Sequence, residues 1–216
     1  MSDIITKNIS VEKTARYFLL GKSFGKVEEL WFVLHGYGQL AEDFIKQFEF
    51  LNNGSNLIVA PEALNKFYVR GFSGKIGASW MTKEDRENEI ADYINYLNKI
   101  SETIFNDVTP QKINVLGFSQ GTATVCRWLN SSKLKPENIF LCSGGVPPDL
   151  HLDKENSFLH KSKLWLIVGN ADEFISKDRI DEEEELLKKS GTSYKLIVFD
   201  GGHTMNLISL KNILKN

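Results

Sequence analysis

The chain has little cysteine, no long apolar run and no large excess of charge of either sign. Two cysteines among 216 residues are too few for a disulfide framework, and we expect both, Cys126 and Cys142, to be buried free thiols. The longest early apolar run, Leu30 to Leu34, is far too short to cross a bilayer, and the N-terminus lacks the apolar stretch of a secretory signal. We therefore predict a cytoplasmic protein without a membrane span.

The charges nearly cancel, since 26 lysines and arginines stand against 28 aspartates and glutamates. No basic stripe of the kind that neutralises phosphates occurs, which argues against a nucleic acid partner. Hydrophobic residues make up 42% and charged residues 25%, close to globular averages, which excludes a disordered or collagen-like chain. The length predicts a single domain over residues 1–216.

Short apolar segments alternate with helix-length amphipathic segments along most of the chain. This order predicts an α/β fold, with a mostly parallel central sheet and helices on both faces. The expected strands are Arg16–Leu20, Glu29–His35, Asn56–Ala60, Ile113–Gly117, Asn138–Ser143, Lys163–Gly169 and Tyr194–Phe199. The expected helices are Leu40–Leu51, Lys83–Phe105, Gln120–Leu129, Lys177–Lys189 and Met205–Leu214.

Four finer expectations accompany this order. The weak alternation of Ile4–Ile9 predicts an antiparallel edge hairpin with Arg16–Leu20. Thr82 and Asp85 resemble a capping box that starts the long helix expected over Lys83–Phe105. The acidic run Asp181–Glu185 is typical of a solvated helix face, since its last two glutamates each precede a lysine by four residues. The connection between the strands at 138–143 and 163–169 is too short for an inserted lid domain.

The segment Gly117-Phe118-Ser119-Gln120-Gly121 follows an expected buried strand and opens an expected helix. A glycine-flanked serine in this position is typical of a nucleophile elbow, a sharp turn that lifts the hydroxyl clear of the sheet. The turn also puts Ser119 at a helix N-terminus, where developing negative charge is stabilised. Ser119 is therefore the candidate nucleophile.

A serine nucleophile needs a histidine base that is oriented by a carboxylate. His203 follows the last strand, at the same sheet edge as Ser119, whereas His151 and His160 lie in a polar connection. Asp172 follows the strand before, as the order serine, acid, histidine requires. Asp178 and Asp200 remain the competing carboxylates.

A turn at the end of an early strand, Leu34-His35-Gly36-Tyr37-Gly38, stands where such sites take their second oxyanion-hole donor. We predict that the backbone N–H groups of Tyr37 and Gln120 form the oxyanion hole. His35, Gly36 and Gly38 are expected to bind substrate, because the missing side chains of the two glycines let the substrate come close to the backbone of this turn.

The longest irregular stretch, Pro61–Met81, carries several aromatic side chains among glycines. We expect it to form the wall of a substrate pocket, with Phe72 and Trp80 in contact with substrate. The alternative is that these aromatics only cover the sheet.

Together these motifs, with Ala60-Pro61-Glu62-Ala63 and Ala78-Ser79-Trp80, resemble the small carboxylesterase and acyl-protein thioesterase family of α/β-hydrolases over nearly the whole chain. The resemblance implies a serine hydrolase with Ser119, Asp172 and His203 as its triad and with no metal or organic cofactor. This chain departs from the family pattern at three places. Thr122 stands where the family usually has a glycine, and Gln39 where it has an aspartate. The family also has a proline shortly after the acid, whereas residues 173–176 of this chain contain none.

The sequence thus predicts a hydrolase of small-molecule esters or thioesters that acts through an acyl-enzyme. A peptidase on the same fold and a non-catalytic binding protein are the alternatives. The oligomeric state and the acyl chain length stay open, because fold and triad fix the chemistry and not the substrate.

Overall fold

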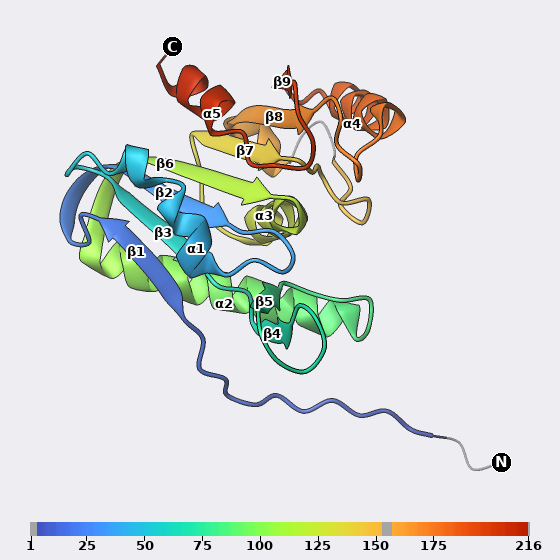
Figure 1. Ribbon diagram of the computed structural model, residues 1–216. Coiled ribbons are helices and arrows are strands. Elements are labelled where there is room, and N and C mark those ends of the chain that lie inside the picture. The colour runs from blue at the N-terminus through green and yellow to red at the C-terminus, as the bar shows by residue number, and fades with distance from the viewer. Residues whose placement is uncertain (1–3, 153–156, 216) are drawn as a thin grey trace.

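The computed structural model describes residues 4–152 and 157–215. The expected alternation of strands and helices is present (Figure 1). In chain order the elements are β1 (Tyr17–Gly21), β2 (Gly25–Leu34), α1 (Ala41–Lys46), η1 (Glu49–Leu51), β3 (Leu57–Pro61), β4 (Asn65–Tyr68), β5 (Ile76–Ser79), α2 (Arg86–Asp107), β6 (Val108–Phe118), α3 (Gln120–Ser131), β7 (Asn138–Cys142), η2 (Phe158–Lys161), β8 (Lys163–Gly169), α4 (Lys177–Lys189), β9 (Tyr194–Phe199) and α5 (Leu207–Leu214).

Seven strands of the described chain form one sheet in the order β1-β3-β2-β6-β7-β8-β9. β1 runs antiparallel to β3, and all other neighbours in this sheet are parallel. Leu34 pairs with Gly117 and Phe118 with Cys142, so the ends of the central strands meet at one edge. This is the edge at which ligands bind in open parallel sheets.

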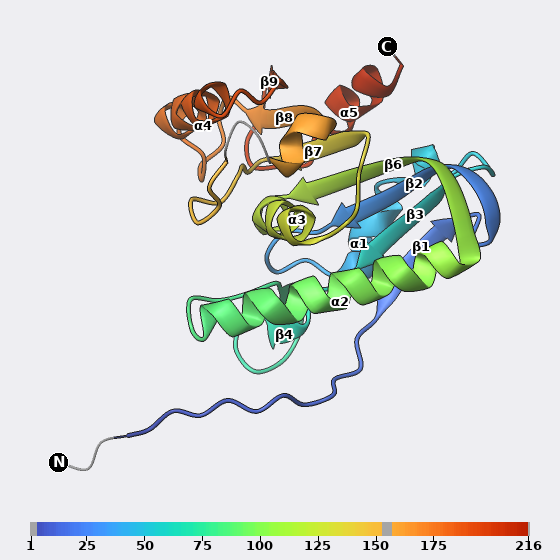
Figure 2. The same cartoon turned by 180° about the vertical axis from the view of Figure 1, so that it is seen from behind.

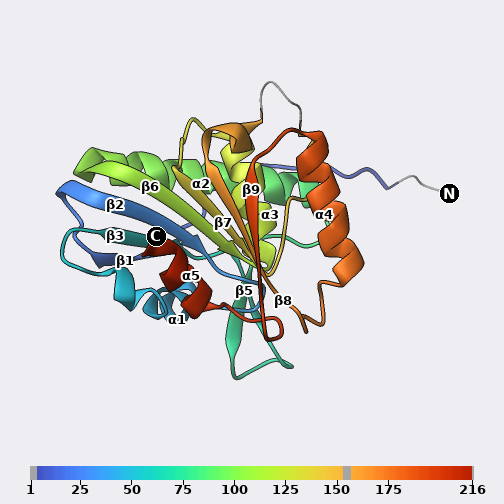
Figure 3. The same ribbon diagram turned by 90° about the horizontal axis from the view of Figure 1, so that it is seen from above.

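Helices cover both faces of the sheet, as predicted. Figure 3 shows α1 and α5 on one side and α2 and α3 on the other, and Figure 2 shows α2 running along its face. Alternate residues of β2 face opposite cores, with Leu30 and Phe32 in the core under α2 and α3, and Trp31 and Val33 in the core under α1 and α5. The central strands are buried on both faces, which explains their continuous apolar sequences.

The expected hairpin at the N-terminus is wrong. β1 is an antiparallel edge strand, but its partner is β3, with Tyr17 opposite Pro61 and Gly21 opposite Leu57. Ile4 and Ile9 lie in an extended segment that leads away from the sheet and are 97% and 87% exposed (Figure 1). β1 therefore pairs with the buried strand β3, and the weakly alternating segment Ile4–Ile9 forms no strand.

Two helix expectations need correction. α2 begins at Arg86, and Asp85 precedes it in a left-handed conformation with φ 48° and no side-chain cap, so the predicted capping box is absent. The Thr82 hydroxyl instead contacts Glu84 and Glu89. The helix expected over 40–51 is divided into α1 and η1.

Pro61–Met81 is less irregular than expected, because β4 and β5 form an antiparallel hairpin within it. The described part of the connection from β7 to β8, residues 143–152 and 157–162, contains η2 and no α-helix, so it holds no lid domain. Cys126 and Cys142 are buried and free, as predicted.

Candidate active site

Ser119 lies in the turn between β6 and α3. Its backbone has φ 53° and ψ −118°, a strained conformation for a residue with a side chain. Both neighbouring glycines are required, because a Cβ at Gly117 would lie 2.5 Å from the Gly121 carbonyl oxygen and one at Gly121 would lie 2.4 Å from that of Leu34. The Ser119 N–H donates to the Cys142 carbonyl at 2.9 Å, which ties the turn to β7.

His203 lies in the loop that follows β9 and meets Ser119 directly. Its Nε2 is 2.8 Å from Ser119 Oγ. The imidazole is packed between two aromatic rings, with ring centroids 5.3 Å from Phe118 and 4.8 Å from Phe174. The His203 backbone N–H also donates to the Glu173 carboxylate at 3.3 Å. The ring is thereby held with Nε2 toward Ser119 and Nδ1 toward Asp172.

Asp172 lies beyond β8 and meets that other nitrogen. His203 Nδ1 is 2.8 Å from Oδ2 and 3.0 Å from Oδ1 of the carboxylate, which is fully buried. Asp172 Oδ1 also accepts the backbone N–H groups of Phe174 at 2.9 Å and Ile175 at 3.1 Å. These bonds fix the carboxylate, and the carboxylate orients the imidazole. The three side chains form one continuous hydrogen-bonded chain.

The competing residues lie elsewhere. Asp178 is exposed in the first turn of α4, and Asp200 is exposed at the end of β9. His151 is exposed, and His160 Nε2 lies 3.1 Å from the Ser190 carbonyl oxygen. None of these four side chains contacts Ser119 or His203 in the described part of the chain.

The backbone N–H groups of Tyr37 and Gln120 point to no protein acceptor within residues 4–152 and 157–215. Their neighbours are bonded: the Gly36 N–H donates to Gln39 Oε1 at 2.7 Å, and the Gly38 N–H to the Ala78 carbonyl at 2.9 Å. The turn after β2 is therefore anchored on both sides of a free donor. An oxyanion hole requires backbone donors of this kind, free of protein acceptors.

His35 belongs to the core, and the prediction that it binds substrate is wrong. It is fully buried, its Nδ1 donates to the Gly36 carbonyl at 2.7 Å, and its Nε2 accepts the Ala63 N–H at 3.1 Å. Burial lowers the pKa of His35, while the Gly36 carbonyl and the Glu62 charge act in the opposite direction. The ring is thus a neutral brace between two loops.

Gly36 and Gly38 shape the turn, since their N–H groups are taken up by protein acceptors. Gly38 has φ +74° and lies against Gly77, where a Cβ would approach the Gly38 carbonyl oxygen to 2.5 Å. Neither glycine has a free N–H for a substrate, and the close approach of substrate to the backbone at these two positions stays a prediction.

The aromatic pocket wall expected from Pro61–Met81 is not formed by its two predicted residues. Trp80 is 1% exposed, donates from Nε1 to the His35 carbonyl at 2.8 Å and packs against Tyr93, so it is a core residue. Phe72 is 98% exposed in the turn between β4 and β5 and encloses no space. The alternative, that these aromatics cover the sheet, holds for Trp80.

Each departure from the family pattern has a local partner. The Thr122 hydroxyl donates to the Ser119 carbonyl at 2.7 Å, and Gly144 makes room for it, since a Cβ there would lie 2.2 Å from Thr122 Oγ1. Gln39 holds the Gly36 N–H, and Glu173 accepts from the His203 N–H.

A buried carboxylate near the site was missed. Glu183, in the acidic run of α4, is 7% exposed, while Glu184 and Glu185 pair with lysines as expected. Glu183 lies three residues after Ile180 and four before Leu187, on the apolar stripe of the helix. This spacing is the sequence signal that would have predicted its burial.

No helix within the described ranges has both the length and the hydrophobicity of a membrane span. Residues 22–215 match the family model described as phospholipase/carboxylesterase, and a search of curated proteins gave no match.

Solved structures share the fold across nearly their whole length. Acyl-protein thioesterase 2 of Zea mays superposes with a TM-score of 0.68 at 18% identity, covering 94% of this chain and 97% of the other. A phospholipase/carboxylesterase from Dyadobacter fermentans gives 0.69 at 18% identity, with 94% and 96% covered. The esterase PE8 gives 0.67 at 22% identity, with 93% and 98% covered. At these identities the likeness shows an α/β-hydrolase fold, and the family model, which spans most of the chain, shows that the chain belongs to the phospholipase/carboxylesterase family.

Proposed function

We propose that this protein is a serine hydrolase that cleaves small-molecule carboxylic esters or thioesters through an acyl-enzyme. The observation that carries the proposal is the unbroken hydrogen-bonded chain from Ser119 Oγ through His203 to the buried Asp172 carboxylate. The free N–H groups of Tyr37 and Gln120 support it further.

In the proposed first step, His203 Nε2 takes the proton of Ser119 Oγ as the oxygen attacks the carbonyl carbon. The Tyr37 and Gln120 N–H groups bind the resulting oxyanion, each contributing about 3 to 4 kcal/mol to the barrier reduction. His203 then protonates the leaving oxygen or sulfur, and the acyl group stays on Ser119.

In the second step, His203 takes a proton from water, which attacks the acyl-serine ester. The proton returns to Ser119 Oγ as the carboxylic acid leaves. Asp172 keeps the Nδ1 proton of His203 in place throughout and stabilises the imidazolium. No step draws on a metal or an organic cofactor. The cytoplasmic location and the single domain over 1–216 stay predictions.

The experiment is hydrolysis of a chain-length series of p-nitrophenyl esters and acyl-thioesters by wild type and Ser119→Ala. We expect at least about a 10⁴-fold loss of kcat in the variant, because the nucleophile is removed. Ser143→Ala is the matched control, since Ser143 is also a serine with positive φ at a strand end, yet within the described residues its hydroxyl contacts only the Thr204 carbonyl. Equal activity of wild type and Ser119→Ala would contradict the proposal, and an inactive, folded wild type would favour a binding protein.

A further inference from the structure

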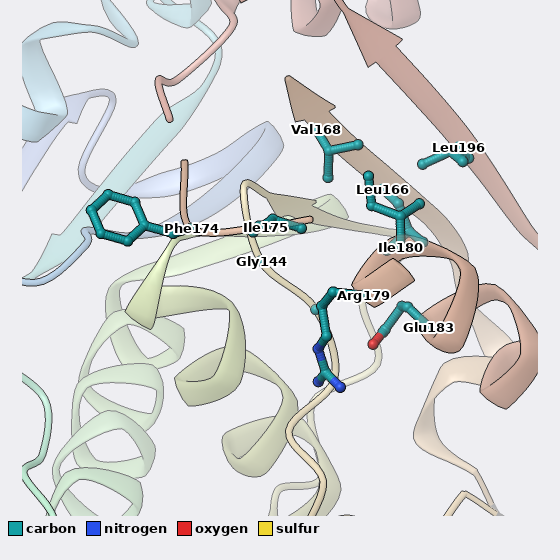
Figure 4. Close-up of a pocket in the computed structure, with 10 residues that line it drawn as sticks. Gly144, Leu166, Val168, Phe174, Ile175, Arg179, Ile180, Glu183 and Leu196 are labelled. Carbon is teal, nitrogen blue, oxygen red and sulfur yellow. The ribbon is translucent and has the colours of Figure 1, made fainter. Parts of the chain in front are cut away.

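A cavity of about 200 Å³ lies between α4 and the sheet (Figure 4). Much of its lining is apolar and comes from β8, β9, α4 and the loop after Asp172, namely Leu166, Val168, Leu196, Ile180 and Ile175. None of the sequence motifs predicted it, because its residues are dispersed over four elements.

The cavity borders the reacting groups. Phe174, at one end of it in Figure 4, stacks edge-on against His203 at 4.8 Å between ring centroids. Gly144, which also lines it, lies so close to Ser119 that a Cβ on this glycine would be 2.9 Å from the Ser119 carbonyl oxygen. A group attached to a carbonyl at Ser119 therefore has the cavity within reach.

Its volume sets the size of that group. An apolar cavity of about 150 Å³ is known to admit benzene. About 200 Å³ thus accommodates a compact group of roughly six to eight non-hydrogen atoms. A long fatty acyl chain would extend beyond it.

The other end of the cavity is polar. Glu183 lies there (Figure 4). Its Oε1 accepts the Val146 N–H at 2.8 Å. The absence of a side chain at Gly145 lets the backbone approach this carboxylate, since a Cβ there would lie 2.7 Å from Glu183 Oε2. Burial raises the pKa of Glu183, while the Val146 N–H and the Arg179 charge act in the opposite direction. No side-chain oxygen of the described residues is both fully buried and without a partner, but a carboxylate has about four acceptor sites, so Glu183 can accept a further hydrogen bond from a group in the cavity.

Arg179 also lines the cavity, where it is half-exposed and pairs with Glu182 at 3.2 Å. Its positive charge opposes the entry of an ammonium group. A neutral donor such as a hydroxyl meets no such opposition and still supplies a hydrogen bond to the carboxylate.

We propose that this cavity is a specificity subsite for a compact apolar group of the substrate that ends in a hydroxyl, and that Glu183 accepts the hydroxyl hydrogen bond. The proposal rests on the esterase function proposed above and names a substrate class for it. The group can belong to the acyl or to the alcohol part of the ester, and the test has one arm for each.

The acyl arm compares p-nitrophenyl 6-hydroxyhexanoate with p-nitrophenyl heptanoate, and the alcohol arm compares 6-hydroxyhexyl acetate with heptyl acetate. Within each pair a hydroxyl replaces a methyl group at the end of the chain. We expect kcat/KM to favour the hydroxyl ester in one arm. Glu183→Gln keeps an acceptor for Val146 but removes the charge, and should lower that preference about 5- to 10-fold. Glu185→Gln, which neutralises an exposed glutamate on the same helix, should leave it unchanged.

A second variant, Ile180→Phe, fills the cavity and should abolish the hydroxyl preference. A preference for the methyl ester in both arms, or a hydroxyl preference that survives both Glu183→Gln and Ile180→Phe, would overturn the subsite. Fluorophosphonate labelling of wild-type Ser119 is measured alongside. A labelled enzyme without the hydroxyl preference refutes the subsite alone, whereas an unlabelled folded protein refutes the proposed hydrolase as well.

Discussion

Replacing Asp172 by asparagine tests the role of the buried carboxylate, because the amide keeps its shape but exchanges one acceptor for a donor. In the native site Oδ1 accepts two backbone N–H groups, from Phe174 and Ile175, while Oδ2 lies 2.8 Å from His203 Nδ1. The asparagine amide has two possible orientations, and the neighbouring donors decide between them.

With the amide nitrogen at the Oδ1 position, two buried backbone donors face a donor. Each lost bond costs about 1 to 3 kcal/mol, so this orientation costs about 2 to 6 kcal/mol. With the nitrogen at the Oδ2 position, both backbone bonds survive, and only the His203 proton has to move from Nδ1 to Nε2. That shift between neutral tautomers is the smaller cost, so we expect the second orientation.

Nε2 then carries the proton and can no longer take one from Ser119 Oγ, which lies 2.8 Å away. We expect kcat for a p-nitrophenyl ester to fall by about 10⁴-fold, the effect of a wrong histidine tautomer in serine hydrolysis. That fall corresponds to about 5.4 kcal/mol of activation free energy. Thermal unfolding, measured alongside, should change little because the backbone bonds are kept.

Asp178→Asn and Asp200→Asn are the matched controls, since both carboxylates are exposed and neither bonds to His203 within the described residues. Both variants should retain wild-type kinetics. An Asp172→Asn enzyme within tenfold of wild-type kcat would refute the tautomer reasoning, and so would an equal loss in either control.

Three further predictions concern the scaffold of the site. Trp80→Ala should lower the free energy of unfolding by about 3 to 5 kcal/mol, because it removes a large core side chain. The ratio of kcat/KM between short and long acyl esters should not change. An altered ratio in a stably folded variant would show that Trp80 lines the substrate pocket after all. Gly121→Ala should destabilise the protein by at least about 1 to 3 kcal/mol in urea unfolding, because its Cβ would lie 2.4 Å from the Leu34 carbonyl oxygen; unchanged stability would contradict this contact. Burial holds the pKa of His35 below 6.5, so the unfolded chain binds a proton that the native state excludes, and stability should fall by up to about 1.4 kcal/mol per unit as pH drops below 6.5. His35→Gln should remove this part of the slope, and equal slopes for both proteins between pH 5 and 8 would refute it.

The strands of the sheet centre could be predicted because burial on both faces leaves continuous apolar runs such as Ile113–Gly117. The turn around Ser119 could be located because glycines are required at fixed positions on either side of the serine. These local requirements, combined with strand order, also indicated Asp172 and His203 as its neighbours.

The elements that depend on distant partners could not be predicted in the same way. β4 and β5 are only four residues each, and the intervening residues give no tight-turn signal. Phe72 and Trp80 both belong to an aromatic stretch, yet one is exposed and the other is in the core, a difference that depends on packing against Tyr93 and His35. Glu183 looked like its neighbours in an acidic run, because composition concealed its position on the buried stripe of α4.

The most direct test of the central claim is to treat the folded protein with a serine-directed fluorophosphonate and to locate the label by peptide mass spectrometry. We expect one label on Ser119, which is lost in Ser119→Ala, retained in Ser143→Ala and absent when the wild type is denatured before treatment. A folded wild type that takes up no label, or takes it up at another residue, would contradict the role of Ser119 as the nucleophile.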